Sequence, residues 1–219
     1  MRILIIAPHP DDEVLGMGGT IKKLSKKNDI LLTVVSEGAT AQYSDKKMIK
    51  VRKNSCEKSS KILGISKINF LEFPDMKLEN IPQLEINKKL EEIISEFNPK
   101  VVYTSPNNDL NLDHKKVFES TLVVTRPTSN NVKQVLSYEL PGHKKIPFNS
   151  NIFENITKEI KYKIQAFKMY KTEVMKFPHP RSIEAIENLA IQRGVDAGLK
   201  RAEAFQLIRS IIEWWKNLT

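Results

Sequence analysis

Short apolar segments alternate with longer amphipathic segments along this chain. The apolar segments are rich in Val, Ile and Leu, which favours buried strands. They are Arg2–Ala7, Ile30–Ser36, Ile68–Phe73, Lys100–Thr104 and Gln134–Tyr138. Between them apolar residues recur at helical spacing, as at Val14, Met17, Ile21 and Leu24 or at Ile86, Leu90, Ile93 and Phe97, which predicts amphipathic helices. The alternation predicts an α/β fold with three Rossmann-like layers, in which helices cover both faces of a mostly parallel sheet.

The rhythm changes after Tyr138. One more short strand is expected at Ile152–Asn155. Thr157 and Ser182 are suitable N-cap residues for two further helices, the second ending near Arg193. Internal repeats and linker-like composition are absent from the sequence, so residues 1–219 are predicted to form a single domain whose C-terminal part packs on the same sheet.

The charge of the chain raises the question of a nucleic-acid partner. The net charge is +9, and the excess lysine is concentrated in Lys22–Lys27 and Lys46–Lys61. Neither segment has the interleaved aromatic residues of a single-strand binder, so both are interpreted as solvated helix faces. We expect no nucleic-acid partner, although a basic polyanion-binding module remains an alternative. The charge can also attract an anionic substrate.

Three features favour a cytoplasmic protein without membrane contact. The apolar segments are too short to span a bilayer, and the first of them, Arg2–Ala7, is shorter than the apolar part of a signal peptide. The single cysteine, Cys56, allows no disulfide framework. Trp214 and Trp215 could cover a neighbouring copy, which leaves a homo-oligomer open.

The most informative segment runs from Ala7 to Glu13, where the first strand gives way to a helix. Ligands favour this position in open α/β sheets. A dinucleotide-binding turn would place glycines here, whereas Gly16–Gly19 come later and are expected to allow close helix–sheet packing. His9 and Asp12 can converge on a divalent metal. The adjacent Asp11 can then take a proton from metal-bound water, as hydrolysis requires.

A catalytic zinc usually has three protein ligands and one open position. His114 follows the fourth predicted strand and is expected at the same edge of the sheet as His9, so it is predicted to be the third ligand beside His9 and Asp12. Asp113 is assigned a catalytic role in orienting a water, a substrate or a neighbouring side chain. Two histidines and one carboxylate also suit ferrous iron, but the extra base Asp11 favours Zn²⁺.

These residues resemble the LmbE/PIG-L deacetylases, whose signature is Ala-His-Pro-Asp-Asp-Glu after the first strand, with a later Asp-His. Here the signature is Ala7-Pro8-His9-Pro10-Asp11-Asp12-Glu13, with one additional proline. The resemblance implies that His9, Asp12 and His114 bind zinc and that Asp11 is the general base. It also implies a hydrolase that removes an N-acetyl group from an N-acetylglucosamine-type amino sugar or sugar conjugate. A metal-dependent phosphoesterase is the competing enzyme class.

One position departs from the pattern of several family members, which have His-Pro-Asp-His. The first of those histidines is implicated in stabilising the transition state, and Asn111 stands in its place here. Either Asn111 donates a neutral hydrogen bond, or His179, held between two prolines and followed by Arg181, supplies the charge. His179 is therefore a catalytic candidate, and Asn111, Asp75 and Arg181 are predicted to contact the substrate.

Overall fold

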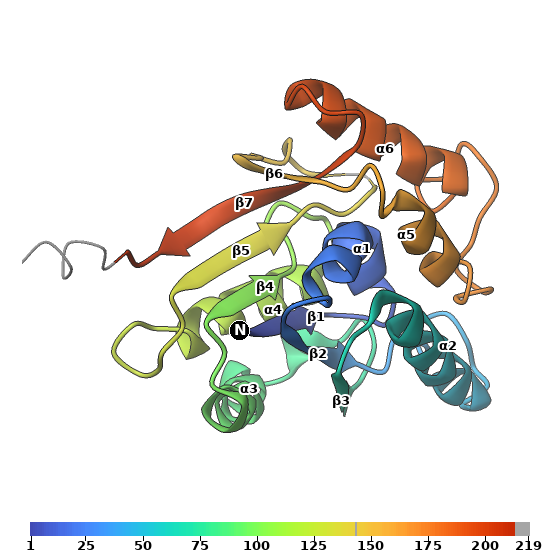
Figure 1. The fold of residues 1–219 in the computed structure, drawn as a ribbon. Coiled ribbons are helices and arrows are strands. Elements are labelled where there is room, and N and C mark those ends of the chain that lie inside the picture. Colours follow the sequence, from blue (N-terminus) through green and yellow to red (C-terminus); the bar gives the residue numbers. More distant parts are fainter. Residues whose placement is uncertain (143, 213–219) are drawn as a thin grey trace, which may run out of the picture.

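The computed structural model describes residues 1–142 and 144–212. One seven-stranded sheet lies at its centre, in the order β3-β2-β1-β4-β5-β7-β6 (Figure 1). The strands are β1 (Arg2–Ala7), β2 (Asp29–Ser36), β3 (Lys67–Phe73), β4 (Val101–Thr104), β5 (Gln134–Tyr138), β6 (Ile152–Asn155) and β7 (Ala202–Ser210). The first five pair in parallel, whereas β7 runs antiparallel to β5 and β6. The predicted mostly parallel α/β sheet is confirmed.

Helices cover both faces of this sheet (Figure 1). One face carries α1 (Asp12–Leu24), α2 (Lys47–Leu63), α5 (Ile160–Phe167) and α6 (Ile183–Asp196); the other carries α3 (Gln83–Phe97), α4 (Leu112–Val124) and the short 3-10 helix η1 (Leu78–Asn80). Because successive side chains of a strand point to opposite faces, β1 contributes to both cores. Ile3 and Ile5 pack in one, and Leu4 and Ile6 pack in the other.

The C-terminal part agrees with the sequence in some places and not in others. Strand β6 lies at the predicted residues, and Ser182 Oγ accepts a hydrogen bond from the backbone N–H of Ala185 as the predicted N-cap of α6. The N-cap predicted at Thr157 is wrong, because its N–H donates to the side chain of Asn155 in a turn and α5 begins only at Ile160. Trp214 and Trp215 lie outside the described residues.

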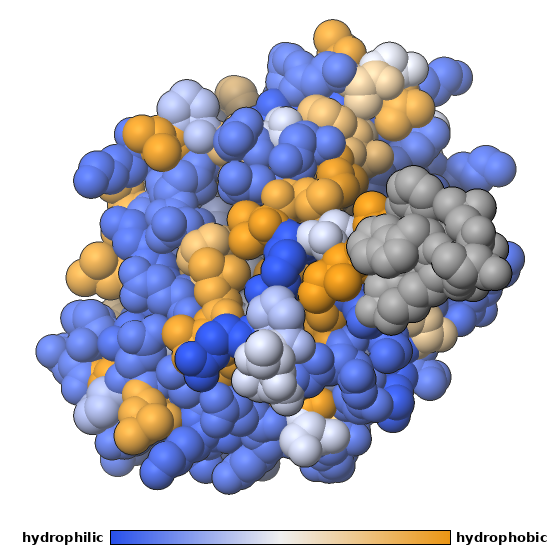
Figure 2. Space-filling view, turned by 90° about the vertical axis from the view of Figure 1, so that its left-hand side faces the viewer, coloured by the Kyte–Doolittle hydropathy of each residue, from blue (hydrophilic) through white to orange (hydrophobic). Residues whose placement is uncertain are grey.

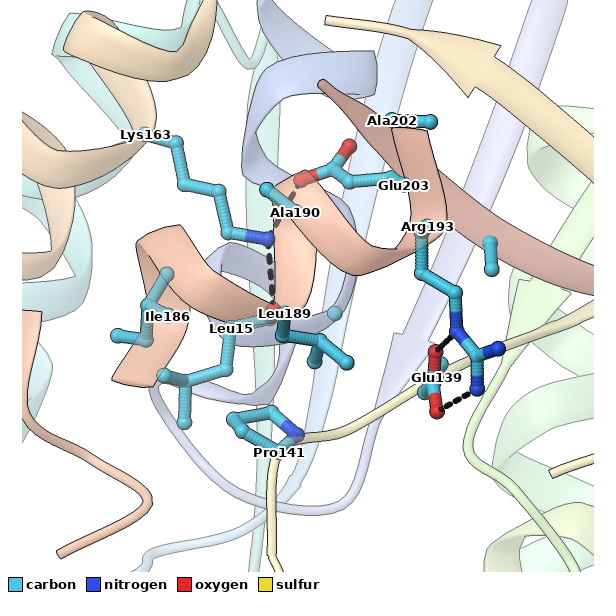
Figure 3. A pocket seen from close by; sticks show the side chains of 12 residues that line it. Leu15, Glu139, Pro141, Lys163, Ile186, Leu189, Ala190, Arg193, Ala202 and Glu203 are labelled. Carbon is cyan, nitrogen blue, oxygen red and sulfur yellow. Dashed lines mark hydrogen bonds and ion pairs between the residues drawn. The ribbon is translucent and has the colours of Figure 1, made fainter. Parts of the chain in front are cut away.

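Helix α1 is broken at Met17, whose φ of −147° is not helical. A buried ion pair satisfies the backbone groups that the break leaves open: Glu203 accepts hydrogen bonds from the N–H groups of Gly19 and Thr20, and Lys163 Nζ donates to the carbonyl of Leu15. Lys163 Nζ and Glu203 Oε1 are 2.6 Å apart (Figure 3). The cavity beside the pair holds about 10 Å³, which is room for roughly one water molecule.

The predicted role of the glycines in α1 is confirmed at Gly16. A Cβ atom at Gly16 would lie 2.4 Å from Cδ2 of Tyr138 in β5, so only glycine lets the helix approach the sheet this closely. Tyr138 itself is fully buried, and its hydroxyl donates to the carbonyl of Ile6 in β1. The contact between Gly16 and Tyr138 therefore holds the first turn of α1, which carries Asp12, close to β1 and β5.

One face of the molecule is predominantly hydrophilic. Figure 2 views the molecule from the side on which β7 ends in Figure 1, and charged and polar residues cover most of that face. The lysines of α2, such as Lys50 and Lys58, are exposed as expected, but the same helix buries Arg52. Across the described residues, no helix has the length and apolar character needed to span a membrane.

Candidate metal centre and active site

Two loops at one edge of the sheet bring the candidate ligands together. His9, Asp11 and Asp12 lie in the turn from β1 to α1, and His114 lies in the first turn of α4, after β4. Strands β1 and β4 are parallel neighbours, so their carboxyl ends open side by side. This neighbourhood explains how residues from distant parts of the sequence reach one site.

His9, Asp12 and His114 each offer one donor atom to a common point. Asp12 Oδ2 lies 3.2 Å from His9 Nδ1 and 3.4 Å from His114 Nε2, and the two nitrogens are 3.3 Å apart. In tetrahedral zinc sites with bonds of about 2.0–2.1 Å, neighbouring ligand atoms are roughly 3.3 Å apart. All three side chains are buried. The donor set therefore fits a tetrahedral divalent metal in both chemistry and spacing.

Carboxylates hold the outer nitrogen of each imidazole. Asp109 Oδ2 lies 2.8 Å from His114 Nδ1, and Asp113 Oδ2 lies 2.9 Å from His9 Nε2. Partners of this kind fix the tautomer and the orientation of metal-binding histidines. With the protons on these outer nitrogens, the lone pairs of His9 Nδ1 and His114 Nε2 are directed towards Asp12.

Both carboxylate oxygens of Asp113 are engaged in hydrogen bonds. In addition to His9, its Oδ2 accepts a hydrogen bond from the N–H of Met76 at 2.9 Å, and its Oδ1 accepts one from Leu78 at 3.0 Å. Asp75 is also buried, and its Oδ1 lies 3.3 Å from His9 Nε2. His9, Asp75 and Asp113 thus form a second group of potential metal ligands. In this group both carboxylates lie against His9 Nε2, the nitrogen that is already hydrogen-bonded to Asp113.

The electrostatics of the cluster favour positive charge between these side chains. Burial lowers the pKa of His9, but hydrogen bonds to Asp113 and Asp12 outweigh it and raise the pKa to about 10. Burial also lowers the pKa of His114, and Asp12 and Asp109 reverse the effect to give about 9. The surrounding carboxylates thus favour positive charge on or between the two rings. A divalent cation at this point would interact favourably with the same carboxylates.

Asp11 has a different environment from Asp12. Its backbone has a φ of 120°, a conformation that L-residues rarely adopt and that is often found at functional sites. The side chain is fully buried, and neither carboxylate oxygen accepts a hydrogen bond. Burial raises the pKa of Asp11, while the charges of Arg52 and Arg181 lower it. It is a carboxylate beside the metal cluster with free lone pairs.

Two arginines flank Asp11. Arg52 Nη2 lies 3.5 Å from Asp11 Oδ1, and Arg181 Nη1 lies 3.8 Å from Asp11 Oδ2. Glu173 joins them, with Oε1 2.6 Å from Arg52 Nη1 and Oε2 2.6 Å from Arg181 Nη1. Arg52 also donates to the carbonyl of Pro10. The arrangement places two positive charges beside a buried carboxylate whose pKa is raised on balance, and these charges oppose the effect of burial.

The other predicted residues lie at the margin of the site. Asn111 is the N-cap of α4: its Oδ1 accepts from the N–H of Asp113, and its Nδ2 lies 3.3 Å from Met76 Sδ. His179 is exposed, and its Nδ1 accepts a hydrogen bond from the N–H of Arg181. Of the residues from this loop, Arg181 is the one whose side chain reaches Asp11.

Asp109, Arg52 and Glu173 have no role in the predictions made from the sequence. Asp109 stands five residues before His114 in a loop full of Asn and Asp, and that proximity was an available signal. Arg52 sits in a lysine-rich segment that was interpreted as solvated, and Glu173 has no motif around it. Only the folded chain brings these two to the site.

Known proteins match this chain in family, in sequence and in fold. The family model PIG-L, described as GlcNAc-PI de-N-acetylase, matches residues 4–125, which contain the three donors and Asp11. Diacetylchitobiose deacetylase of Thermococcus kodakarensis is 32% identical over 106 residues, which are 46% of this chain and 39% of that protein. The chain thus matches well under half of that relative.

Two further similarities cover more of the chain. A protein of Escherichia coli K12 described as uncharacterized deacetylase YaiS is 30% identical over 179 residues, 78% of this chain and 90% of that one. A solved structure of N,N'-diacetylchitobiose deacetylase from Pyrococcus horikoshii, bound to an inhibitor, has a TM-score of 0.81 at 22% identity. It covers 100% of this chain and 88% of that one. The structural likeness extends over every strand described above.

Proposed function

The chain belongs to the PIG-L family of de-N-acetylases, and from that membership we propose that it is a metal-dependent hydrolase acting on an N-acetylglucosamine-type amino sugar or sugar conjugate. The observation that carries this proposal is the set of three donor atoms on His9, Asp12 and His114, 3.2 to 3.4 Å from one another. Asp11 stands beside them as a buried carboxylate whose oxygens accept no hydrogen bond. The reaction cleaves the amide bond and releases acetate and a free amine.

We propose Zn²⁺ as the metal. Bound by His9, Asp12 and His114, it would supply Lewis acidity that lowers the pKa of water and polarises the acetyl carbonyl. The spacing of the donors suits tetrahedral coordination. Two histidines and one carboxylate also suit ferrous iron, but iron oxygenases have no need of the adjacent base that Asp11 provides.

Asp11 is proposed to be the general base. Its two oxygens lack hydrogen-bond partners in the fold, so they are available to accept a proton from the attacking water and to return it to the leaving amine. Arg52 and Arg181 keep positive charge within 4 Å of this carboxylate. Their charge favours the ionised form that a base requires.

Substrate contacts are proposed at the rim of the site. Asp75 and Arg181 can bind hydroxyl groups of the sugar, because both reach the cluster from separate loops. Asn111 is the third substrate contact, and either it or His179 donates to the acetyl oxygen as negative charge develops there. The lone buried Cys56 is consistent with the cytoplasm as the place of action.

The test is an activity panel with a metal assay on the same sample. N-acetylglucosamine, N-acetylated nucleotide sugars and N-acetylglucosaminides are each incubated with zinc-loaded protein, and released acetate is measured. Asp11→Asn is the matched negative control, and a phosphate monoester tests the phosphoesterase alternative. Acetate release that Asp11→Asn abolishes would support the proposal. Phosphate release without acetate release would overturn it.

A further inference from the structure

Exposed apolar side chains gather on the loops that build the site. Single exposed apolar residues are ordinary on any protein, whereas a group of them at one place indicates a binding surface. Met76, Leu110, Ile146 and Phe177 are 49%, 58%, 60% and 60% exposed. Each belongs to a different loop at the carboxyl edge of the sheet, and we call these four side chains the apolar collar.

Three members of the collar lie on loops that contact one another. The backbone N–H of Met76 donates to Asp113, and Met76 Sδ lies 3.3 Å from Asn111 Nδ2. Leu110 directly precedes Asn111 in the same loop. The carbonyl of Ile146 accepts from Asn108 Nδ2 at 2.8 Å. Met76, Leu110 and Ile146 therefore belong to neighbouring loops, and the loop of Leu110 leads into the first turn of α4, which carries His114.

Phe177 lies on a fourth loop, which reaches the site through Arg181. It belongs to the loop of residues 175–181, in which the N–H of His179 donates to the carbonyl of Lys176. The same loop ends at Arg181, whose guanidinium reaches Asp11. This loop thus reaches the general base from a part of the chain separate from the loops of the other three residues.

We infer that the natural substrate carries an apolar aglycone, an alkyl, acyl or aromatic group joined to the N-acetylglucosaminyl unit. This inference rests on the proposed function, because the collar residues lie on the loops that carry or contact the site at which the acetylated sugar would bind. The sugar would lie at the buried polar cluster, and the aglycone would cover the collar. A hydrophilic partner such as a second sugar would leave four large apolar side chains in water, without the gain that their burial provides.

The test compares two substrates that differ only in the aglycone. Octyl and methyl N-acetylglucosaminide are supplied below the micelle concentration of the octyl compound, and kcat/KM is measured from acetate release. Burial of one methylene is worth roughly fourfold in binding, so partial coverage of the octyl chain should favour the octyl glycoside about tenfold or more. Equal kcat/KM values would overturn the inference and leave the proposed function standing. Acetate release from neither glycoside by metal-loaded protein would overturn the proposed function and this inference with it.

Collar variants make the test specific to these residues. Ile146→Ser and Phe177→Ser should move the octyl-to-methyl ratio of kcat/KM towards one. Val195→Ser is the matched control, because Val195 is 69% exposed near the far end of α6 and its replacement should keep the wild-type ratio. Wild-type ratios in both collar variants would overturn the inference. The inference would also be overturned if the wild-type protein is a dimer that Ile146→Ser dissociates while the octyl-to-methyl ratio of kcat/KM stays unchanged. The collar would then be the contact surface for a second copy of the chain.

Discussion

His9 Nδ1 and His114 Nε2 face each other at 3.3 Å although the residues are 105 positions apart in the sequence. The outer nitrogen of each ring is held by a carboxylate, Asp113 for His9 and Asp109 for His114. Two like groups with inward-facing lone pairs would repel each other unless a cation or a proton lay between them. The arrangement therefore favours a positive charge between the two rings, which a proton or a divalent cation can supply.

The first prediction concerns metal content. Purified wild-type protein should hold one divalent metal per chain, and His114→Ala should hold far less, because two remaining donors bind zinc poorly. Elemental analysis of both proteins provides the measurement. His179→Ala serves as the control and should retain the metal, since His179 is exposed and its Nδ1 accepts from Arg181 N–H. Full occupancy in His114→Ala would remove His114 from the site.

The second prediction concerns the carboxylate behind His114. Asp109→Ala leaves the three donors in place but frees the ring of His114, and loss of such a partner typically costs about tenfold to a hundredfold in metal affinity. Competition with a chelator measures the affinity. Asp196→Ala is the control, because Asp196 pairs with Arg193 on α6, outside the cluster. Unchanged affinity in Asp109→Ala would show that packing alone orients the ring.

The third prediction separates the base from the ligands. Asp11→Asn should keep the metal but lower turnover about a hundredfold or more, the scale of a lost general base. The amide has nearly the same shape as the carboxylate and cannot accept the proton of water. Metal analysis and steady-state kinetics on one sample give both readouts. Near wild-type turnover with intact metal would transfer the role to another carboxylate, and Asp113 is unsuited because both its oxygens are occupied.

Much of the fold could be predicted because its signals are local. Short runs of Val, Ile and Leu separated by helical periods identified β1 to β5, and Ser182 marked the start of α6. Strand β7 was missed, since Ala202–Ser210 mixes buried and half-exposed residues and lacks a continuous apolar run. Its antiparallel pairing with β5 and β6 depends on contacts across the whole C-terminal part, which periodicity does not record.

The site residues that lie in local sequence motifs could be predicted in the same way. His9, Asp11 and Asp12 stand together in one turn, and the position of His114 after a strand suggested the same edge of the sheet. Arg52 could not be recognised, because nothing distinguishes it from the exposed lysines around it until α2 packs and buries it. Side chains that act through another residue leave no pattern in a single sequence.

The fourth prediction concerns stability. Lys163 and Glu203 are a buried pair at the break in α1, and removing one partner of such a pair costs about 3–5 kcal/mol because the other charge stays buried. Glu203→Ala should lower the free energy of unfolding by that amount in denaturant titrations. Glu154→Ala is the control, since its pair with Lys23 lies at the surface and such pairs contribute at most about 1 kcal/mol. Equal losses in the two variants would contradict the structural role of Glu203.

The last prediction decides between two donors to the acetyl oxygen. Asn111 is already engaged, since its Oδ1 caps α4 through Asp113 N–H and its Nδ2 lies against Met76 Sδ. His179 has a defined tautomer in its neutral form, because Nδ1 accepts from the N–H of Arg181 and the proton must therefore sit on Nε2. That Nε2–H group is a donor two residues before Arg181, whose guanidinium reaches Asp11.

We therefore expect His179→Ala to lower kcat about a hundredfold, the usual scale for a lost donor to a developing oxyanion, with metal content and folding unchanged. The loss should fall on kcat more than on KM, because the donor acts on charge that appears only in the transition state. Asn111→Ala should change kcat less, and thermal melts control for the lost helix cap. If His179→Ala keeps kcat within a few-fold of wild type while Asn111→Ala does not, the donor is Asn111 and His179 is a loop residue.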